Sequence, residues 1–358
     1  DHTVVVRSQQ TKHSITGGGT AVEKEFDLII KNAKVYDGSG GPWYFSDIAV
    51  KDGIIAGTGK INDSRGKRCI DGEGRAAAPG FVDPHTHSDC NCATVPDADA
   101  KIVQGVTTEV TGNCGLSLTP VSKERVGLLR DYLKPFIPGP GMPDFQWSHA
   151  GELMDIVDRN GYTNDLAFLS GHGTVRIAVM GFDDREPSPT ELEQMKKLFA
   201  REMEDGCVGS STGLIYPPGC FTSAPEIVEF CRVAALYEGV YSTHMRGESA
   251  EILKSVKEAI DAAEKGGCRL QISHHKIIHE YEGLSAETLR MMEEARGRGI
   301  DVACDVYPYT AGSTLISVVL PTWAREGGVE KMLSRLENTV ERERIKSDFL
   351  REIPGWDN

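Results

Sequence analysis

The sequence predicts an α/β protein whose main part is a (β/α)8 barrel of the TIM type, preceded by a small β-sandwich domain. From residue 81 onward, short apolar runs of strand character alternate with longer, charge-rich stretches of helical character. Several of these runs end in polar or metal-binding residue types, and the active sites of such barrels lie at the C-terminal ends of their strands. Between residues 26 and 80, short alternating blocks are separated instead by Asp-Gly and Gly-Gly turn signals.

These sequence patterns divide the chain into three parts. Residues 1–25 are polar and Gly-rich and do not begin with Met, so we expect a disordered or processed segment without function. Residues 26–80 form the small β domain, and residues 81–358 form the barrel. The 358 residues are 39% hydrophobic and 26% charged, which is typical of a globular protein with a sizeable core.

The barrel region contains seven strand-like runs, which are residues 81–87, 106–112, 166–173, 206–213, 239–244, 270–275 and 301–309. The stretches between them are helical in character, for example residues 188–205 and 250–267. The second of these has apolar residues at helical spacing, namely Ile252, Val256, Ala259, Ile260 and Ala263. Seven strands would leave an open barrel with two unpaired edges, so we expect the eighth strand to lie outside this sequence.

Charge and cysteine content narrow the possible partners. A net charge of −14 disfavours nucleic acid and anionic membrane surfaces, and no apolar run approaches the roughly 20 residues that cross a bilayer. Nine cysteines without regular spacing do not indicate a disulfide framework, so we expect reduced thiols and a cytoplasmic location. A small molecule is therefore the expected partner.

Histidines follow three of the predicted strands. His85 and His87 are two residues apart, so on a strand both imidazoles point to one side and can share a metal. His244 and His274 end two further runs, and the C-terminal ends of barrel strands converge. We therefore predict a metal centre, whereas His275, next to His274, faces the opposite side and is expected to be structural.

A cysteine completes the predicted ligand set. Cys114 follows the second strand in a turn flanked by Gly112 and Gly115, which lets the backbone approach a site closely. Nitrogen and sulfur ligands together suit zinc. His172, after the third strand, is compatible with either a pocket or a structural role.

These motifs resemble a known family. Residues 79–89, Pro-Gly-Phe-Val-Asp-Pro-His-Thr-His-Ser-Asp, are similar to the amidohydrolase superfamily. Residues 105–108 and 111–115, followed by 243–246, 272–276, 305–309 and 311–314, resemble the N-acyl-D-amino-acid deacylases, or D-aminoacylases. The resemblance extends from about residue 26 to the end of the sequence.

The resemblance implies roles for individual residues. Cys114, His244 and His274 would hold one tightly bound zinc, while His85 and His87 would form a second, weaker metal position. Lys276 and Tyr307 match positions that hold the substrate carboxylate, although a solvated charge and a core aromatic residue are the alternatives. Arg246 and Ser313 lie in matching motifs and are further substrate-binding candidates.

The resemblance also implies the reaction. We expect hydrolysis of an N-acyl-D-amino acid to a carboxylate and a free D-amino acid, with water activated by zinc. The family's proton-transferring aspartate follows the eighth strand, so its position would lie beyond residue 358. The alternatives are a cyclic-amide hydrolase, disfavoured because residues 209–213 contain no lysine, and a non-catalytic metal-binding barrel.

Overall fold

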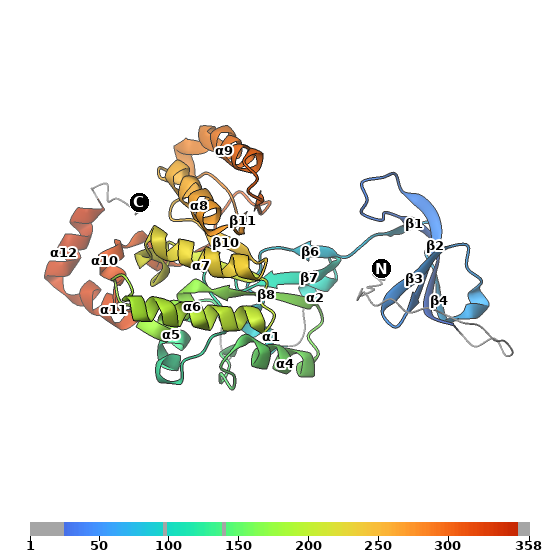
Figure 1. Cartoon of the computed structure of the whole chain (residues 1–358), viewed down its shortest axis with the longest axis horizontal. Helices are drawn as coiled ribbons and strands as arrows, with labels where there is room; N and C mark the ends of the chain where they lie inside the picture. The colour runs from blue at the N-terminus through green and yellow to red at the C-terminus, as the bar shows by residue number, and fades with distance from the viewer. Residues whose placement is uncertain (1–24, 96–98, 138–140, 350–358) are drawn as a thin grey trace. The chain divides into compact units, whose positions relative to one another are not determined.

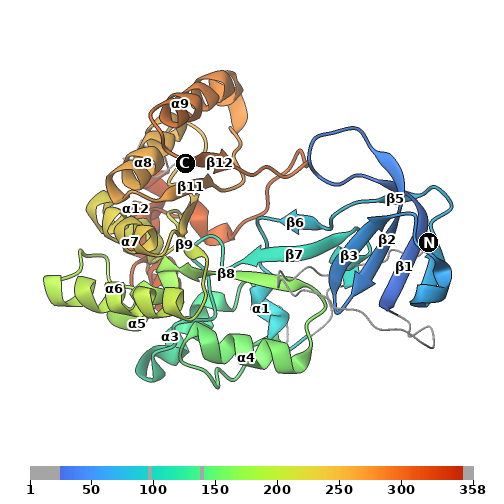
Figure 2. The ribbon, with the colours of Figure 1, turned by 45° about the vertical axis from the view of Figure 1, so that its right-hand side comes forward.

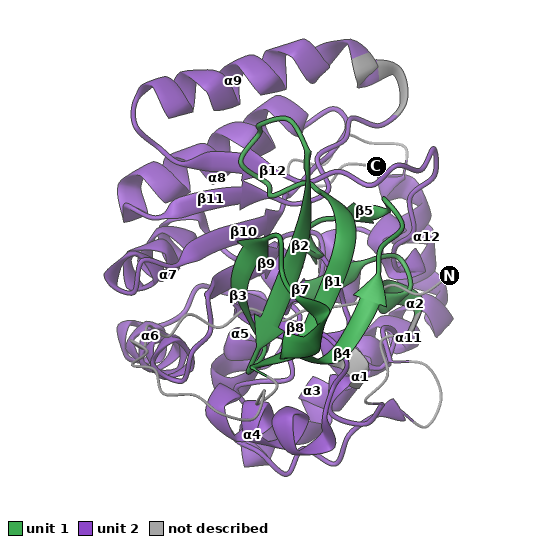
Figure 3. Cartoon of the chain, turned by 90° about the vertical axis from the view of Figure 1, so that its right-hand side faces the viewer, with its two compact units in different colours: residues 1–82, 99–108 green, residues 83–98, 109–358 purple. Residues whose placement is uncertain are grey.

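The computed structural model describes residues 25–95, 99–137 and 141–349 (Figure 1). The sequence prediction for residues 1–25 therefore falls, except for Glu25, outside the described residues. The chain divides into two compact units, one of residues 1–82 and 99–108 and the other of residues 83–98 and 109–358 (Figure 3). The predicted boundary at residue 80 stays a prediction.

The first unit contains a five-stranded mixed sheet. Its strands are β1 (Phe26–Val35), β2 (Tyr44–Lys51), β3 (Ile54–Gly59), β4 (Gly66–Asp71) and β5 (Ala76–Ala77), with the short 3-10 helix η1 (Asp63–Arg65) before β4. The order is β3-β2-β1-β4, with β5 also paired to β1. A half-buried Lys31 extends from β1 to Asp47 on β2, with 2.6 Å between Nζ and Oδ2. This ion pair links the two central strands.

A second sheet contains all seven strands that the sequence predicts after residue 80 (Figure 2). They are β6 (Phe81–Asp83), β7 (Val106–Thr111), β8 (Asp165–Gly171), β9 (Gly209–Gly213), β10 (Val240–His244), β11 (Arg269–Ile272) and β12 (Val302–Cys304). Within the described residues their order is β12-β11-β10-β9-β8-β7-β6, and the pairs from β8 to β12 are parallel. The strand order follows the sequence, as in a barrel wall.

Helices lie between these strands and after β12. They are α1 (Asp89–Cys92), α2 (Asp99–Ile102), α3 (Val126–Leu133), α4 (Ala150–Asn160), α5 (His172–Met180), α6 (Pro189–Glu204), α7 (Ala224–Leu236), α8 (Ile252–Gly266), α9 (Ser285–Gly297), α10 (Thr322–Arg325), α11 (Val329–Glu337) and α12 (Thr339–Asp348). Short 3-10 helices are η2 (Lys123–Arg125), η4 (Gly219–Phe221), η5 (His279–Leu284) and η6 (Ile316–Val319). Helices α6 to α9 stand in a row beside the strands (Figure 3). The fold is therefore α/β with a parallel sheet.

The two helices predicted most explicitly are present. Ser188 caps α6 in a capping box, in which its hydroxyl accepts from the Glu191 N–H and the Glu191 side chain accepts from the Ser188 N–H. All five apolar residues predicted to share one face of α8 are buried. Burying that face stabilises the helix against the sheet. Among the described residues, no helix combines the length and hydrophobicity that crossing a bilayer requires.

Candidate metal centre

The five histidine and cysteine residues predicted as ligands lie together. Cys114, His244 and His274 form one group, and His85, His87 and Cys114 form a second. Within each group the potential ligand atoms lie within 4.8 Å of one another. The Cys114 sulfur belongs to both groups, so the two groups of potential ligands adjoin and share one sulfur atom.

The spacing of the donor atoms suits a metal ion. The Cys114 Sγ atom lies 3.3 Å from His85 Nε2 and 3.7 Å from His274 Nε2. His274 Nε2 lies 2.9 Å from His244 Nδ1. A tetrahedral zinc ion with bonds of about 2.0–2.3 Å keeps its ligand atoms roughly 3.3–3.6 Å apart. A small outward shift of the imidazoles would therefore admit the ion.

A buried nitrogen gives a second indication. His87 Nδ1 has no hydrogen-bond partner among the described residues. Buried polar atoms are nearly always paired, and an unpaired one calls for an explanation such as an ion or water. Together with the nitrogen and sulfur donor set, this atom fits a metal cofactor.

The turn after β7 delivers Cys114. Gly112, Cys114 and Gly115 all have positive φ angles, of 76°, 56° and 74°. A Cβ at residue 112 would lie 2.0 Å from the Leu169 carbonyl oxygen, so only glycine fits there. Cys114 itself is not a glycine, and its left-handed backbone is the kind of strain that concentrates at functional sites.

Strand register places His244 and His274 at one edge. Thr243 is the partner of Ile272 in the parallel pair of β10 and β11, so His244 lies beside the residue that precedes His274. His274 has a φ of 35°, which turns the chain directly after β11. Their rings meet edge to face, with centroids 4.3 Å apart.

His85 and His87 reach the centre by a different route from the predicted one. The prediction placed both on the first barrel strand, but β6 ends at Asp83. The His85 N–H donates to Asp83 Oδ1 at 3.2 Å, and the Thr86 N–H donates to the Val110 carbonyl at 3.0 Å. The first bond is local and the second joins the chain to β7, while the chain bends at residues 84–85 and leaves the strand. The two imidazoles still lie edge to face.

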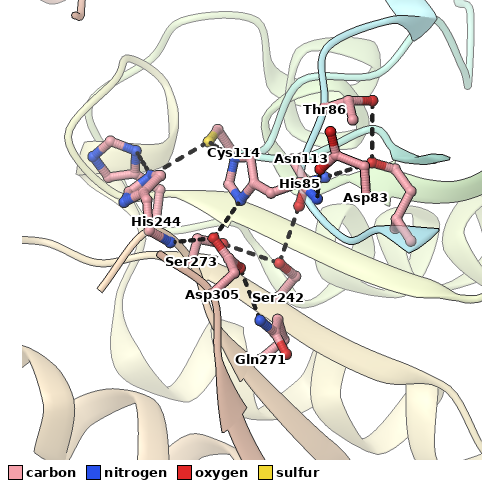
Figure 4. A network of polar contacts seen from close by, with 12 residues as sticks. Asp83, His85, Thr86, Asn113, Cys114, Ser242, His244, Gln271, Ser273 and Asp305 are labelled. Carbon is pink, nitrogen blue, oxygen red and sulfur yellow. Dashed lines mark hydrogen bonds and ion pairs between the residues drawn. The ribbon is translucent and has the colours of Figure 1, made fainter. Parts of the chain in front are cut away.

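Two carboxylates that the sequence analysis did not single out lie beside the Nδ1 atoms of two candidate ligand histidines. Glu248 Oε1 lies 2.9 Å from His274 Nδ1, and Asp305 Oδ1 lies 3.3 Å from His85 Nδ1. Asp305 also accepts from the His274 N–H at 2.6 Å and from Gln271 Nε2 at 2.8 Å (Figure 4). Carboxylates behind ligand histidines orient the rings and increase their basicity. Acidic residues just after β10 and β12 were the available signal.

Burial dominates the electrostatics of the centre. It lowers the pKa of His87 to about 4, with His85 and His274 adding to the effect. Burial also lowers the pKa of His244 and raises that of the Cys114 thiol. Burial opposes ionisation of Glu248, but the hydrogen bond with His274 and the nearby charges bring its pKa down to about 2. Neutral imidazoles beside ionised carboxylates are suited to bind a cation.

The four candidate substrate residues differ in their surroundings. Lys276 Nζ lies 2.5 Å from Glu248 Oε2 and 5.5 Å from the centre of the Tyr307 ring, so these two candidates adjoin the metal centre. Arg246 instead pairs with Glu258 at 3.1 Å and donates to the carbonyls of Cys220 and Thr222. Ser313 is exposed. Substrate binding by all four stays a prediction.

The other two histidines considered in the sequence analysis have structural contacts. His275 Nε2 lies 3.0 Å from Thr288 Oγ1, as its expected structural role requires. His172 is completely buried, and its Nε2 lies 2.9 Å from Glu226 Oε1. Neither belongs to the two groups of potential ligands.

Comparison with known proteins agrees with this chemistry. A profile of the amidohydrolase family matches residues 68–337. The D-aminoacylase of Alcaligenes xylosoxydans xylosoxydans is 35% identical over 292 residues, which are 81% of this chain and 59% of that protein. The chain spans about three fifths of the length of this protein and of two other curated relatives, an N-acyl-D-aspartate deacylase and an N-acyl-D-glutamate deacylase from the same organism.

Two solved structures show the same similarity. The N-acyl-D-glutamate deacylase from Bordetella bronchiseptica, complexed with zinc and a phosphonate inhibitor, has a TM-score of 0.73 at 32% identity. The match covers 80% of this chain and 59% of that one. A D-aminoacylase structure concerned with a binuclear metal centre also has a TM-score of 0.73, at 35% identity, and the match covers 82% and 62% of the two chains.

Proposed function

The chain belongs to the amidohydrolase family, and from that premise we propose that the protein hydrolyses the amide bond of N-acyl-D-amino acids with zinc as its cofactor. One observation carries the proposal: Cys114 shares its sulfur between two groups of potential ligands at the ends of parallel strands. The relatives named D-aminoacylase and N-acyl-D-glutamate deacylase support the choice of substrate.

We assign the tight zinc position to Cys114, His244 and His274, and a second, weaker position to His85, His87 and Cys114. Zinc bound there would polarise an amide carbonyl and lower the pKa of a water molecule to about 7. The protein's own contribution is to orient these ligands, through Glu248 behind His274 and Asp305 behind His85.

Lys276 is the cation we assign to the substrate carboxylate. Its side chain is about one quarter exposed and its ammonium lies beside His274, so an anionic group could reach it from solvent. Tyr307 is adjacent, and Ser313 and Arg246 are further candidates. A small-molecule substrate, with no nucleic acid or membrane partner and a cytoplasmic location, completes the proposal.

We also propose that the seven-stranded sheet is part of a closed (β/α)8 barrel in the whole protein. Strands β6 and β12 are the outer strands of the described sheet, and a further strand between them would pair both edges. The family's proton-transferring aspartate is expected after that strand. In the first unit, a β-sandwich built on the five-stranded sheet belongs to the same proposal.

The alternative of a cyclic-amide hydrolase gains no support from the fourth barrel strand. The sequence analysis disfavoured such an enzyme because residues 209–213 contain no lysine, and these residues form β9, which reads Gly-Ser-Ser-Thr-Gly. We therefore retain linear N-acyl amides as the substrate class.

The test uses the full-length protein, with N-acetyl-D-methionine as substrate and N-acetyl-L-methionine as its mirror control. We expect bound zinc and turnover of the D substrate, and loss of both in Cys114→Ala. The matched control is Cys207→Ala, because Cys207 is also buried but belongs to neither group of ligands. Zinc bound without turnover in the full-length protein would instead support a non-catalytic barrel.

A further inference from the structure

The ring nitrogen Nδ1 of His274 has two competing neighbours. Glu248 Oε1 lies 2.9 Å from it, and Lys276 Nζ lies 3.3 Å from it. The two neighbours favour opposite tautomers. A carboxylate can only accept, so it requires a proton on Nδ1, whereas an ammonium can only donate, so it requires a lone pair there.

Only one of these tautomers can bind a metal at the centre. His274 Nε2 faces Cys114 and His244, at 3.7 Å and 2.9 Å. With the proton on Nδ1, the Nε2 lone pair points at these ligands and is available to a metal. With the lone pair on Nδ1, Nε2 carries a hydrogen instead and is blocked.

Glu248 also pairs with Lys276, the side chain that competes with it for His274 Nδ1. The second oxygen of Glu248, Oε2, lies 2.5 Å from Lys276 Nζ, so one carboxylate lies within ion-pair distance of both the imidazole and the ammonium. The Glu248 side chain is about 11% exposed and that of Lys276 about 25%, so solvent weakens this pairing little. Lys276 also approaches the His274 carbonyl at 3.4 Å, which keeps it beside the ring.

We propose that Glu248 is a positioning residue that selects the metal-binding tautomer of His274 against Lys276. The inference rests on the proposed metal site and deepens it, because it makes metal affinity depend on a residue that is not itself a ligand. It also accounts for a lysine so close to a predicted zinc ligand: the ammonium is compatible with metal binding only while Glu248 accepts from both groups.

The experiment measures the zinc affinity of the full-length protein by competition with a chromogenic chelator. Glu248→Gln keeps the shape of the side chain but removes the charge that pairs with Lys276, so the ammonium is released to donate to His274 Nδ1. We expect zinc affinity to fall by roughly 10- to 100-fold, the usual effect of losing a carboxylate behind a ligand histidine. Glu251→Gln is the control, because Glu251 pairs with Lys254 at 2.9 Å on the surface and should leave zinc affinity unchanged.

A second substitution separates tautomer selection from simple support of the fold. Lys276→Met removes the competing donor, so the double variant Glu248→Gln/Lys276→Met should recover most of the lost zinc affinity. A general structural role for Glu248 predicts no recovery, since the double variant loses more contacts than the single one. Absence of recovery, or an unchanged affinity in Glu248→Gln, would overturn the proposal.

Lys276→Met alone keeps the inference testable if Glu248→Gln does not fold. Its zinc affinity should equal or exceed that of the parent protein, and a tenfold loss would contradict the proposal. None of these measurements needs turnover. Failure of the deacylase assay with these zinc affinities intact would therefore remove the proposed reaction and leave the tautomer selection standing.

Discussion

Two buried histidines in the barrel unit have nearly the same partners and different surroundings. His172 lies 2.9 Å from Glu226, which also binds Arg176 at 2.7 Å. His274 lies 2.9 Å from Glu248, which also binds Lys276 at 2.5 Å. Each histidine therefore shares one glutamate with one cation.

The second ring nitrogen separates the two arrangements. The His172 ring packs edge to face on Phe230, with centroids 4.6 Å apart, inside the apolar core. The second nitrogen of His274 instead faces the sulfur of Cys114 and the ring of His244. A histidine that contacts a carboxylate and a cation is thus not a candidate metal ligand on that ground alone. Potential ligand atoms around its other ring nitrogen distinguish His274 from His172.

The largest expected loss of stability follows from breaking the structural arrangement. Glu226→Gln leaves the fully buried Arg176 beside a neutral partner. Removing one charge of a buried pair costs about 3–5 kcal/mol of unfolding free energy. Urea denaturation measures this loss, and the folded fraction should retain its zinc.

The control for this variant lies on the same helix. Glu229→Gln on α7 removes a carboxylate that pairs with Lys196 and Arg232 nearer the surface, and should cost less than about 1 kcal/mol. If folded Glu226→Gln lost its zinc as readily as Glu248→Gln, the distinction between the two arrangements would fail.

A third buried glutamate extends the comparison, because its hydrogen-bond partners are neutral. Glu202 accepts from the Thr119 hydroxyl and, at 3.2 Å, from the Ala150 N–H. Burial raises its pKa from 4.5 to about 7, whereas the pKa values of Glu226 and Glu248 are lowered despite burial, chiefly by their bonds to histidine. A neighbouring histidine or cationic group, and not a neutral hydrogen-bond donor, thus decides the direction of the pKa shift.

This shift predicts how stability depends on pH. Between pH 4.5 and about 7 the folded protein binds a proton at Glu202 that the unfolded chain releases, so stability falls as pH rises through this window. The full loss is on the order of 3 kcal/mol. Glu202→Gln should flatten the slope of urea stability against pH, whereas Glu204→Gln, exposed on the same helix, should retain it. An unchanged slope in Glu202→Gln would rule out this assignment.

The sequence predicted the strands, and the clustering of the five candidate ligands, well because their signals are local. All seven barrel runs contain strands, and the five predicted ligands meet, since parallel strands bring their C-terminal ends to one edge. The exact residues at which the strands end were harder to predict from the sequence. Turns with positive φ at Cys114 and His274, and the turn after Asp83, depend on hydrogen bonds to neighbouring strands.

The carboxylates were missed for a related reason. Glu248 and Asp305 act through His274 and His85, which are 26 and 220 residues away in the sequence. Acidic residues near strand ends are common, and only the fold shows which of them face an imidazole. The same reason left His172 undecided, because its position after a strand gave no information about Glu226 or Phe230.

Matched substitutions of His172 and His244 give the smallest expected change in stability. They also separate the two kinds of histidine most clearly, by the zinc content of the purified variants. In His172→Phe, Glu226 keeps Arg176 but loses a hydrogen bond, so we expect a cost of about 1–3 kcal/mol and unchanged zinc content. His244→Phe makes the same replacement at the metal centre and should abolish tight zinc binding, because Cys114 and His274 alone leave the group one ligand short. Urea denaturation and zinc analysis of both purified variants test this pair. Loss of zinc in folded His172→Phe would show that the structural arrangement is coupled to the metal centre, and would remove the distinction on which the assignment of the two histidines depends.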